Sequence, residues 1–266
     1  MDSLKSFMLE KTSRDVAVAF SGGADSSLIL KMAVDAAKLN RREVYAMCIK
    51  TTLHPVGEAE EARKTAEAIG AKFEVIEVDE FAEAGIADNP EDRCYRCKYY
   101  MFSRLKERAA SMGITTILDG TNEDDLHVYR PGIRALRELG ILSPLAECGC
   151  TKEKVRQLLR LYGIETANKP AMPCLATRFP YGTHLTRKKL QKVDEAEKFI
   201  RSFGGYNVRV RVHDKVARIE VDRSGEEIVL QHREEIISKL STLGYDYITL
   251  DLEGFRSGSM DKNIRK

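Results

Sequence analysis

The chain has 266 residues, of which 43 are basic and 41 acidic, giving a formal net charge of +2. This length suits one large or two modest domains, and the balanced charge argues against a general nucleic-acid-binding protein, so we expect small-molecule partners and no nucleic acid. The segment MDSLKSFMLEKTSRD lacks a signal-peptide core, and no run approaches the roughly 20 apolar residues of a membrane span, which favours a cytoplasmic protein without membrane contact.

The first predicted strand leads directly into a glycine turn. VAVAF, beginning at Val16, is an apolar run typical of a buried strand, and SGGADSS follows it where a helix opens near Asp25. Gly22 and Gly23 can adopt backbone angles that bring successive N–H groups into one concavity, and the helix N-terminus adds positive charge, so the segment predicts a phosphate site. No lysine is placed as in a Walker loop. SGGADSS instead resembles the SGGxDS loop of PP-loop ATP pyrophosphatases, which split ATP between its α- and β-phosphates.

Strand and helix patterns alternate through the first half of the chain. Further strands are predicted at 44–49, 73–78 and 116–118, with helices at 26–39, 58–69 and 95–112. This alternation predicts an α/β fold with a doubly wound parallel sheet, in which ligands bind at the carboxyl ends of the strands. Four segments are expected to meet there: SGGADSS, 50–54, Asp79 and 119–125.

The second half predicts a smaller α/β domain. A helix is expected from the N-cap Thr151 to Tyr162, ending at Gly163, and the Pro- and Gly-rich NKPAMPCLATRFPYGT then indicates a linker or active-site loop. Beyond it the patterns predict, in order, a helix, two strands, a helix and a strand at 186–203, 206–212, 216–221, 226–243 and 247–250. We therefore expect a nucleotide-binding domain over 1–170, a linker or active-site loop over 171–185, and a substrate or oligomerisation domain over 186–266.

Cysteines suggest metal or redox chemistry. Cys94 and Cys97 form a Cys-x-x-Cys pair at the mouth of a helix whose dipole favours thiolates, and Cys174 lies in the Pro-rich loop. Three thiolates with one open position suit an iron–sulfur cluster, whereas a redox pair or inert buried thiols are the alternatives. The other cysteines are Cys48, Cys148 and Cys150.

Two arginines of the second domain share one face of a predicted strand. In VRVRV, Arg209 and Arg211 alternate with valines, so both guanidinium groups point the same way. Either this face is solvated, or an anion such as a phosphate or carboxylate lies between them. The single histidines His54, His127 and His213 have no ligand spacing and are expected on the surface or in the core.

Together these segments resemble the LarE family, ATP-dependent sulfur transferases of nickel-pincer cofactor biosynthesis. The resemblance is colinear over nearly the whole chain and rests on SGGADSS, NPEDRCYRCK from Asn89, DGTNEDD from Asp119, YRPG from Tyr129, SPLAE from Ser143, NKPAMPCLATRFPYG from Asn168, RVRVHDKVARIE from Arg209 and DLEGFRSGSM from Asp251. It implies a PP-loop fold and a substrate, pyridinium-3,5-biscarboxylic acid mononucleotide, whose carboxylates are adenylated and converted to thiocarboxylates. It also implies a homo-oligomer, in this family a hexamer, supplied by sulfide or by a sulfur-donor protein.

The resemblance assigns roles to particular residues. Cys94, Cys97 and Cys174 match the branch that holds a 4Fe-4S cluster, and Cys174 also stands at the position that another branch sacrifices as its sulfur source. ATP, its pyrophosphate and Mg²⁺ would be held by Ser21, Gly22, Gly23, Asp25 and Ser26, with Asp25 the metal contact, and the nucleotide pocket would be completed by Gly120, Thr121, Asn122 and Asp125. Arg209 and Arg211 match a basic pair near the substrate phosphate, with Arg178 assisting. Cys148 and Cys150 depart from the usual pattern.

Two other functions fit some of these features. A PP-loop tRNA thiolase could use the same loop and cysteines, although the chain has no recognisable RNA-binding appendage. An ATP-binding module that senses iron or redox state would bind ATP without forming AMP and pyrophosphate.

Overall fold

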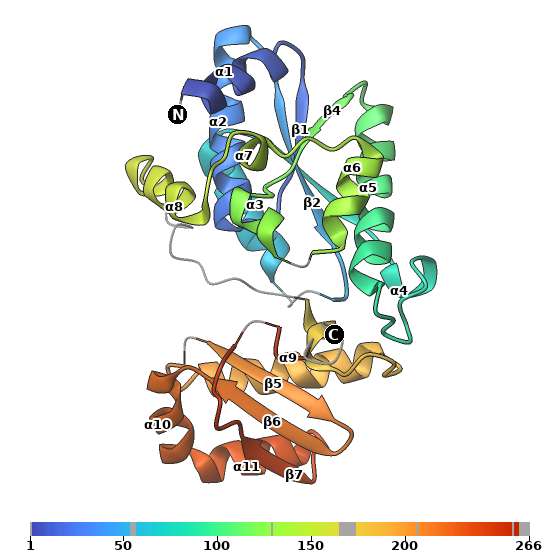
Figure 1. Cartoon of the computed structure of the whole chain (residues 1–266), viewed down its shortest axis with the longest axis vertical. Helices are drawn as coiled ribbons and strands as arrows, with labels where there is room; N and C mark the ends of the chain where they lie inside the picture. Colours follow the sequence, from blue (N-terminus) through green and yellow to red (C-terminus); the bar gives the residue numbers. More distant parts are fainter. Residues whose placement is uncertain are drawn as a thin grey trace. The chain divides into compact units, whose positions relative to one another are not determined.

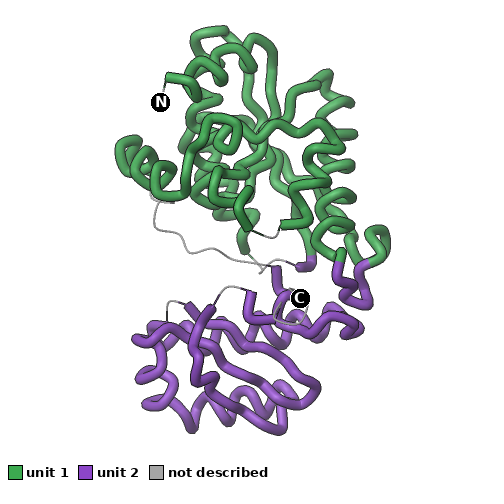
Figure 2. Tube along the Cα trace, viewed as in Figure 1, with its two compact units in different colours: residues 1–51, 56–85, 92–171 green, residues 52–55, 86–91, 172–266 purple. Residues whose placement is uncertain are grey.

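The protein divides into two compact units. The computed structural model describes residues 2–53, 57–128, 130–164, 174–205, 207–256 and 258–260. Unit 1 comprises 1–51, 56–85 and 92–171, and unit 2 comprises 52–55, 86–91 and 172–266, as coloured in Figure 2.

Unit 1 is built on a parallel sheet. Its strands are β1 (Val16–Ala19), β2 (Val44–Lys50), β3 (Lys72–Glu77) and β4 (Thr116–Leu118), in the spatial order β3-β2-β1-β4. β1 pairs on both sides, since Val16 lies opposite Val44 on one neighbour and Thr116 on the other. The strand order reverses at β1, which is where a doubly wound sheet binds its ligand.

Helices cover both faces of this sheet. One face carries α1 (Asp2–Lys11), α2 (Ala24–Asn40), α3 (Glu58–Ile69) and α8 (Lys152–Leu161), and the other carries α5 (Arg93–Ser111) and α6 (Gly132–Leu139), as Figure 1 shows. Val16 and Val18 enter the first core and Ala17 the second, because successive strand side chains point to opposite faces. The short elements are α4 (Glu80–Glu83), η1 (Glu123–His127) and α7 (Pro144–Glu147). The predicted doubly wound parallel sheet is confirmed.

Unit 2 is a smaller α/β unit. Its sheet contains β5 (Val208–His213), β6 (Val216–Val221) and β7 (Tyr247–Leu250), with β5 antiparallel and β7 parallel to β6. Its helices are η3 (Leu175–Arg178), α9 (Arg187–Arg201), α10 (Arg223–Gln231) and α11 (Arg233–Thr242). The predicted second α/β unit is therefore present, and α9 begins after the cap Thr186, whose side chain accepts from Lys189 N at 3.2 Å.

One predicted helix is wrong. The pattern at 226–243 was expected to be continuous, but the structure contains α10 and α11 with His232 between them at φ −105° and ψ 24°. The His232 ring stacks on Phe203 with centroids 4.1 Å apart. α10 also begins earlier than predicted, because the Asp222 side chain accepts a hydrogen bond from Gly225 N at 3.0 Å.

The Pro-rich segment is packed within unit 2 from Cys174 onward, so 174–185 does not form a free linker. Leu175 and Phe179 are buried, and the Asn89 side chain donates to the carbonyls of Phe179 and Pro180 at 3.2 and 2.7 Å. Leu185 N also donates to Ala87 O at 2.6 Å. These bonds explain why 86–91 belongs to unit 2, which a linear division of the chain does not anticipate. Residues 171–173 lie outside the described residues.

Candidate functional site

The phosphate loop folds back onto the first turn of α2. Ser26 Oγ donates to Gly23 O at 3.1 Å and lies 3.3 Å from Ser21 Oγ, while Gly23 N donates to Ser21 Oγ at 3.4 Å. Gly22 has φ 69°, in the left-handed region that glycine tolerates. The two serines therefore fix a turn that brings the loop backbone to the N-terminus of α2.

Gly22 and Gly120 have little room for a side chain, whereas a Cβ on Gly23 would approach only Ser21 Oγ, at 3.3 Å. A Cβ on Gly22 would lie 3.2 Å from both Cα and Cβ of Ala62. A Cβ on Gly120, in the loop after β4, would lie 2.8 Å from the backbone nitrogen of Ser26. The loop after β4 thus lies against the first turn of α2, and the loop after β1 lies against α3, which fits the close backbone approach that a phosphate cradle requires.

Asp25 joins three segments of unit 1. Its Oδ1 accepts from Asn122 Nδ2 at 3.2 Å, and its Oδ2 is in contact with Lys152 Nζ. Asn122 caps η1 together with Asp125, which also pairs with Arg130 at 3.1 Å. The predicted meeting of the loop after β1 with 119–125 is therefore present in the structure, and Lys152 is an addition that the sequence analysis did not include.

The described residues suit a magnesium ion only in part. Among them, no three or more His, Cys, Asp or Glu side chains form a group that could hold a metal. Mg²⁺ commonly takes one or two carboxylates and completes its shell with water and substrate phosphates. Asp25 fits that kind of site, with the condition that Lys152 leaves its carboxylate.

The Thr121 side chain holds the loop after β4 together from within. Its hydroxyl donates to Asp119 Oδ2 at 2.6 Å, and Ser143 Oγ donates to Asp119 Oδ1 at 2.6 Å. Asp119 and Thr121 are both buried. They fix the loop after β4 in place, and the Thr121 hydroxyl points to Asp119.

The cysteines fall into two groups. Cys94 is exposed and Cys97 is buried, and both lie at the start of α5 in unit 1 at a spacing that places them on one helix face. Cys174 lies directly before η3 in unit 2. Cys48, Cys148 and Cys150 contribute instead to the apolar core around α2. Burial raises the pKa of Cys48 from 9.0 to about 11 and also raises the pKa of Cys150, so these two thiols resist ionisation.

Lys98 is another residue near this end of α5 that the sequence analysis missed. It lies one turn after Cys94, and its side chain packs against Gly132 at the start of α6. A Cβ on Gly132 would lie 2.8 Å from Lys98 Cδ. Burial lowers the pKa of its ammonium, and the negative charges of Asp119 and Asp125 act against that effect. A lysine on a polar helix surface gives no sequence signal of this environment.

The three predicted arginines lie in the interior of unit 2. Arg178 donates from Nε and Nη2 to the two oxygens of Glu197 at 2.7 and 2.8 Å, and both side chains are fully buried. Arg211 donates from Nε to Glu220 Oε2 at 3.0 Å and from Nη1 to Thr177 O at 3.0 Å. Of the two alternatives for this strand face, the solvated one is wrong, because Arg209 and Arg211 are only 3% and 4% exposed.

The guanidinium groups nevertheless cluster around Arg209. Its pKa is lowered to about 10, chiefly by burial and also by the positive charges of Arg178, Arg211 and Arg201, against the effect of Glu197. The carboxylate partners Glu197 and Glu220 were not singled out from the sequence. The sequence did contain one signal for a carboxylate partner, since charged residues alternate on β6 as they do on β5. In the structure, the register places Glu220 opposite Arg209.

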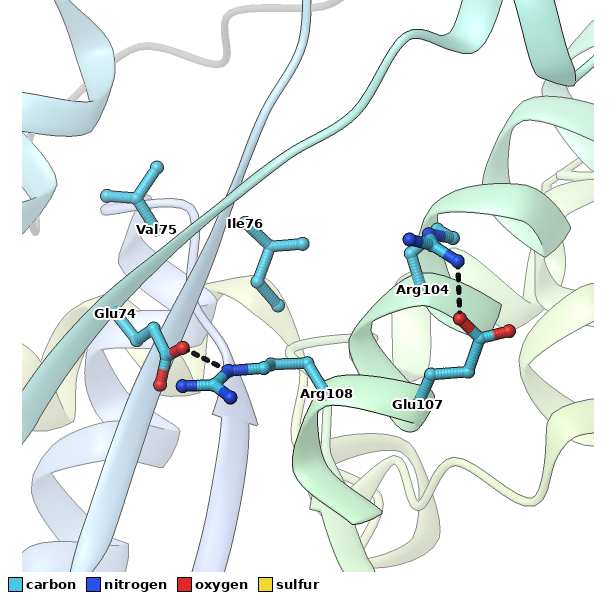
Figure 3. A pocket seen from close by; sticks show the side chains of 6 residues that line it. All are labelled: Glu74, Val75, Ile76, Arg104, Glu107 and Arg108. Atoms are coloured by element: carbon cyan, nitrogen blue, oxygen red, sulfur yellow. Dashed lines mark hydrogen bonds and ion pairs between the residues drawn. The ribbon is translucent and has the colours of Figure 1, made fainter. Parts of the chain in front are cut away.

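A separate pocket of about 240 Å³ lies between β3 and α5 (Figure 3). Its two arginines face carboxylates, since Arg108 contacts Glu74 and Arg104 Nη1 lies 2.6 Å from Glu107 Oε2. The pocket is thus neutralised by its own side chains and contains none of the predicted site residues.

Of the single histidines, His127 pairs with Glu123 at 2.9 Å. His54 lies outside the described residues, and so do residues 165–173. No described helix is long and apolar enough to cross a membrane.

Comparison with known proteins identifies the family. The PP-loop domain family matches residues 1–131. The chain is 41% identical over 253 residues to the pyridinium-3,5-bisthiocarboxylic acid mononucleotide synthase of Lactiplantibacillus plantarum, covering 94% of this chain and 90% of that protein. It is 40% identical over 251 residues to an uncharacterized protein of Synechocystis sp., covering 94% and 92% of the two chains. A Methanocaldococcus jannaschii protein, also uncharacterized, is 30% identical over 255 residues, 96% of each chain. The chain therefore belongs to the LarE family of PP-loop proteins, the family of that synthase.

Proposed function

We propose that this protein is an ATP-dependent sulfur transferase that converts the carboxylates of pyridinium-3,5-biscarboxylic acid mononucleotide to thiocarboxylates. The observation that carries the proposal is 41% identity to a pyridinium-3,5-bisthiocarboxylic acid mononucleotide synthase along 94% of the chain. The phosphate loop at the β1–α2 junction supports it, because a PP-loop is suited to reactions that release pyrophosphate.

The chemistry needs activation before sulfur can attack. A carboxylate is a poor electrophile, since its charge repels nucleophiles and oxide does not leave. Its oxygen would attack the α-phosphorus of ATP, forming an acyl adenylate and releasing pyrophosphate. Sulfur then attacks the acyl carbon, and AMP leaves with the oxygen.

The loop residues would stabilise the charge that leaves with pyrophosphate. Ser21, Gly22, Gly23 and Ser26 present the loop and the N-terminus of α2 to the phosphates, and Gly120 and Asn122 close the site from the loop after β4. Asp25 would hold Mg²⁺, which neutralises phosphate charge when bound. Thr121 and Asp125 position this second loop through Asp119 and Asn122.

The sulfur chemistry would depend on Cys94, Cys97 and Cys174. The first two share a face of α5, and the donor set of three thiols suits a 4Fe-4S cluster with one open iron, which would carry the sulfur to be transferred. Sulfide or a sulfur-donor protein would reload it. Arg209 and Arg211, assisted by Arg178, would hold the substrate phosphate, a role supported by the proximity of their guanidinium groups. The homo-oligomer, a hexamer in the family, belongs to the same proposal.

One assay tests this function against its competitor. Anaerobic protein is incubated with Mg-ATP, sulfide and either the biscarboxylate mononucleotide or bulk tRNA, and products are identified by mass. We expect thiocarboxylated mononucleotide with AMP and pyrophosphate. Thiolated tRNA with unchanged mononucleotide, or ADP as the nucleotide product, would overturn the proposal.

A further inference from the structure

The phosphate loop contains no lysine, yet the structure brings one to it. Lys152 Nζ contacts Asp25 Oδ2, although the two residues are 127 positions apart in the chain. In loops of the Walker type, a lysine within the loop reaches the terminal phosphates. Here the ammonium group of Lys152 comes from α8 and contacts the carboxylate of Asp25, which belongs to the loop motif.

The base of the Lys152 side chain is held firmly. Lys152 opens α8, and its backbone nitrogen donates to Asp124 Oδ2 at 2.7 Å. The Thr151 hydroxyl caps the same helix by accepting from Lys154 N at 3.3 Å, and Val155 is buried in the core. Only the flexible four-carbon stem of Lys152 can therefore change position.

Lys152 and a metal ion would compete for the Asp25 carboxylate. Asp25 binds Lys152 through one oxygen and Asn122 through the other, so a metal ion that binds Asp25 must compete with the lysine. Both side chains of the Lys152–Asp25 pair are partly exposed, at 35% and 22%, so the pair can open to a ligand without exposing core.

We infer that Lys152 exchanges partners when nucleotide binds: its ammonium leaves Asp25 for the β- and γ-phosphates of ATP, and the carboxylate becomes available to Mg²⁺. The inference rests on the proposed function, in which the loop binds ATP. Lys152 is then a phosphate-binding residue that supplies from α8 the cation that the loop lacks. In the nucleotide-free protein it neutralises Asp25 and lowers the affinity of that carboxylate for a metal.

Calorimetry on the full chain separates this role from a structural one. The variants are Lys152→Ala and, as a matched control, Lys154→Ala, which removes the same charge from an exposed position on the same helix. The ligands are α,β-methylene-ATP with Mg²⁺, AMP, and Mg²⁺ alone. Lys152→Ala should weaken the ATP analogue about tenfold to a hundredfold, as expected for a lost charge-assisted contact, and leave AMP affinity unchanged. It should also tighten Mg²⁺ alone about threefold to tenfold, because the competing cation is gone.

Several outcomes would overturn the inference. Equal losses for the ATP analogue and AMP would indicate a general distortion of the site, and an unchanged or weaker Mg²⁺ affinity would contradict the exchange at Asp25. A similar loss of ATP-analogue affinity in Lys154→Ala would show that the effect comes from net charge and not from the position of Lys152. If the unaltered protein binds no ATP analogue, the proposed function fails along with the inference. Normal binding without AMP production overturns the proposed function alone.

Discussion

Arg178 and Glu197 form a bidentate ion pair in unit 2, and both side chains are fully buried. Nε and Nη2 of Arg178 lie 2.7 and 2.8 Å from the two carboxylate oxygens of Glu197. Glu197 also accepts from Val210 N at 3.0 Å, so this carboxylate joins η3, α9 and β5. Arg178, which the sequence analysis assigned to the substrate, therefore also acts as a structural residue.

Removing that carboxylate should be costly. Glu197→Ala leaves a buried guanidinium and a backbone N–H without this partner, and we expect the free energy of unfolding to fall by about 3–5 kcal/mol. Urea denaturation of the full chain measures the loss. Glu195→Ala is the control, because it removes the same charge from the same helix, and the Glu195 side chain, paired with Lys239, is 53% exposed and should contribute less than about 1 kcal/mol. Equal effects of the two changes would contradict the structural role.

Gly120→Ala should impair the nucleotide site directly. Its Cβ would lie 2.8 Å from Ser26 N, so the loop after β4 or the first turn of α2 must move. We expect a destabilisation of about 1–3 kcal/mol together with loss of ATP-analogue binding. In Gly140→Ala the added methyl meets no atom, but the residue has φ 70°. This control should cost about 1–2 kcal/mol of stability and leave nucleotide affinity unchanged.

Asp25→Asn should abolish AMP formation and leave the fold intact. The amide keeps the shape of the carboxylate but removes the charge that Lys152 and a metal ion require. Chromatography of the nucleotide products measures the loss, and thermal unfolding checks the fold. Asp35→Asn, which removes an i,i+4 pair with Lys31 farther along α2, is the control and should retain activity. Unchanged AMP production in Asp25→Asn would remove Asp25 from the site.

Iron content tests the assigned cysteines. Protein reconstituted without oxygen should hold about four irons per chain, and alanine at Cys94, Cys97 or Cys174 should remove most of them. Alanine at Cys48, Cys148 or Cys150 should not, because these side chains pack with the apolar core around α2. If the last two changes remove the iron and Cys174→Ala does not, the proposed ligand set is wrong.

Cys48 should make unit 1 sensitive to alkali. Burial raises its pKa from 9.0 to about 11, so the folded protein retains a thiol proton that the unfolded chain releases. Stability from this group is complete below about pH 9 and is lost as pH rises toward about 11, on the order of 2 kcal/mol. Denaturation curves across this range should be flatter for Cys48→Ala than for the unaltered chain. The same slope in both would show that Cys48 does not ionise on unfolding.

The sheet and one part of the site follow from the sequence. Alternating strand and helix periods predict a parallel sheet, and parallel strands gather their carboxyl ends, which is why Asn122 meets Asp25 as expected. Lys152 could not be placed in this way, since its contact depends on how α8 packs against α2. The arginines of β5 posed a similar difficulty. Their spacing predicts a shared face, but only the fold shows that Glu197 and Glu220 line the interior beside them.

The long sequence separations within the site have a consequence for how it forms. Asp25 meets residues 97 and 127 positions away, and the edge strand β4 bridges to Leu142, so none of these contacts is local. The match to the PP-loop domain family ends at 131, before Leu142 and Lys152. A fragment cut at that boundary would keep the whole signature motif and lose its cation and a strand neighbour. During synthesis, the loop that emerges first from the ribosome would be completed only after α8 has followed, so nucleotide binding should report that the folding of unit 1 is complete.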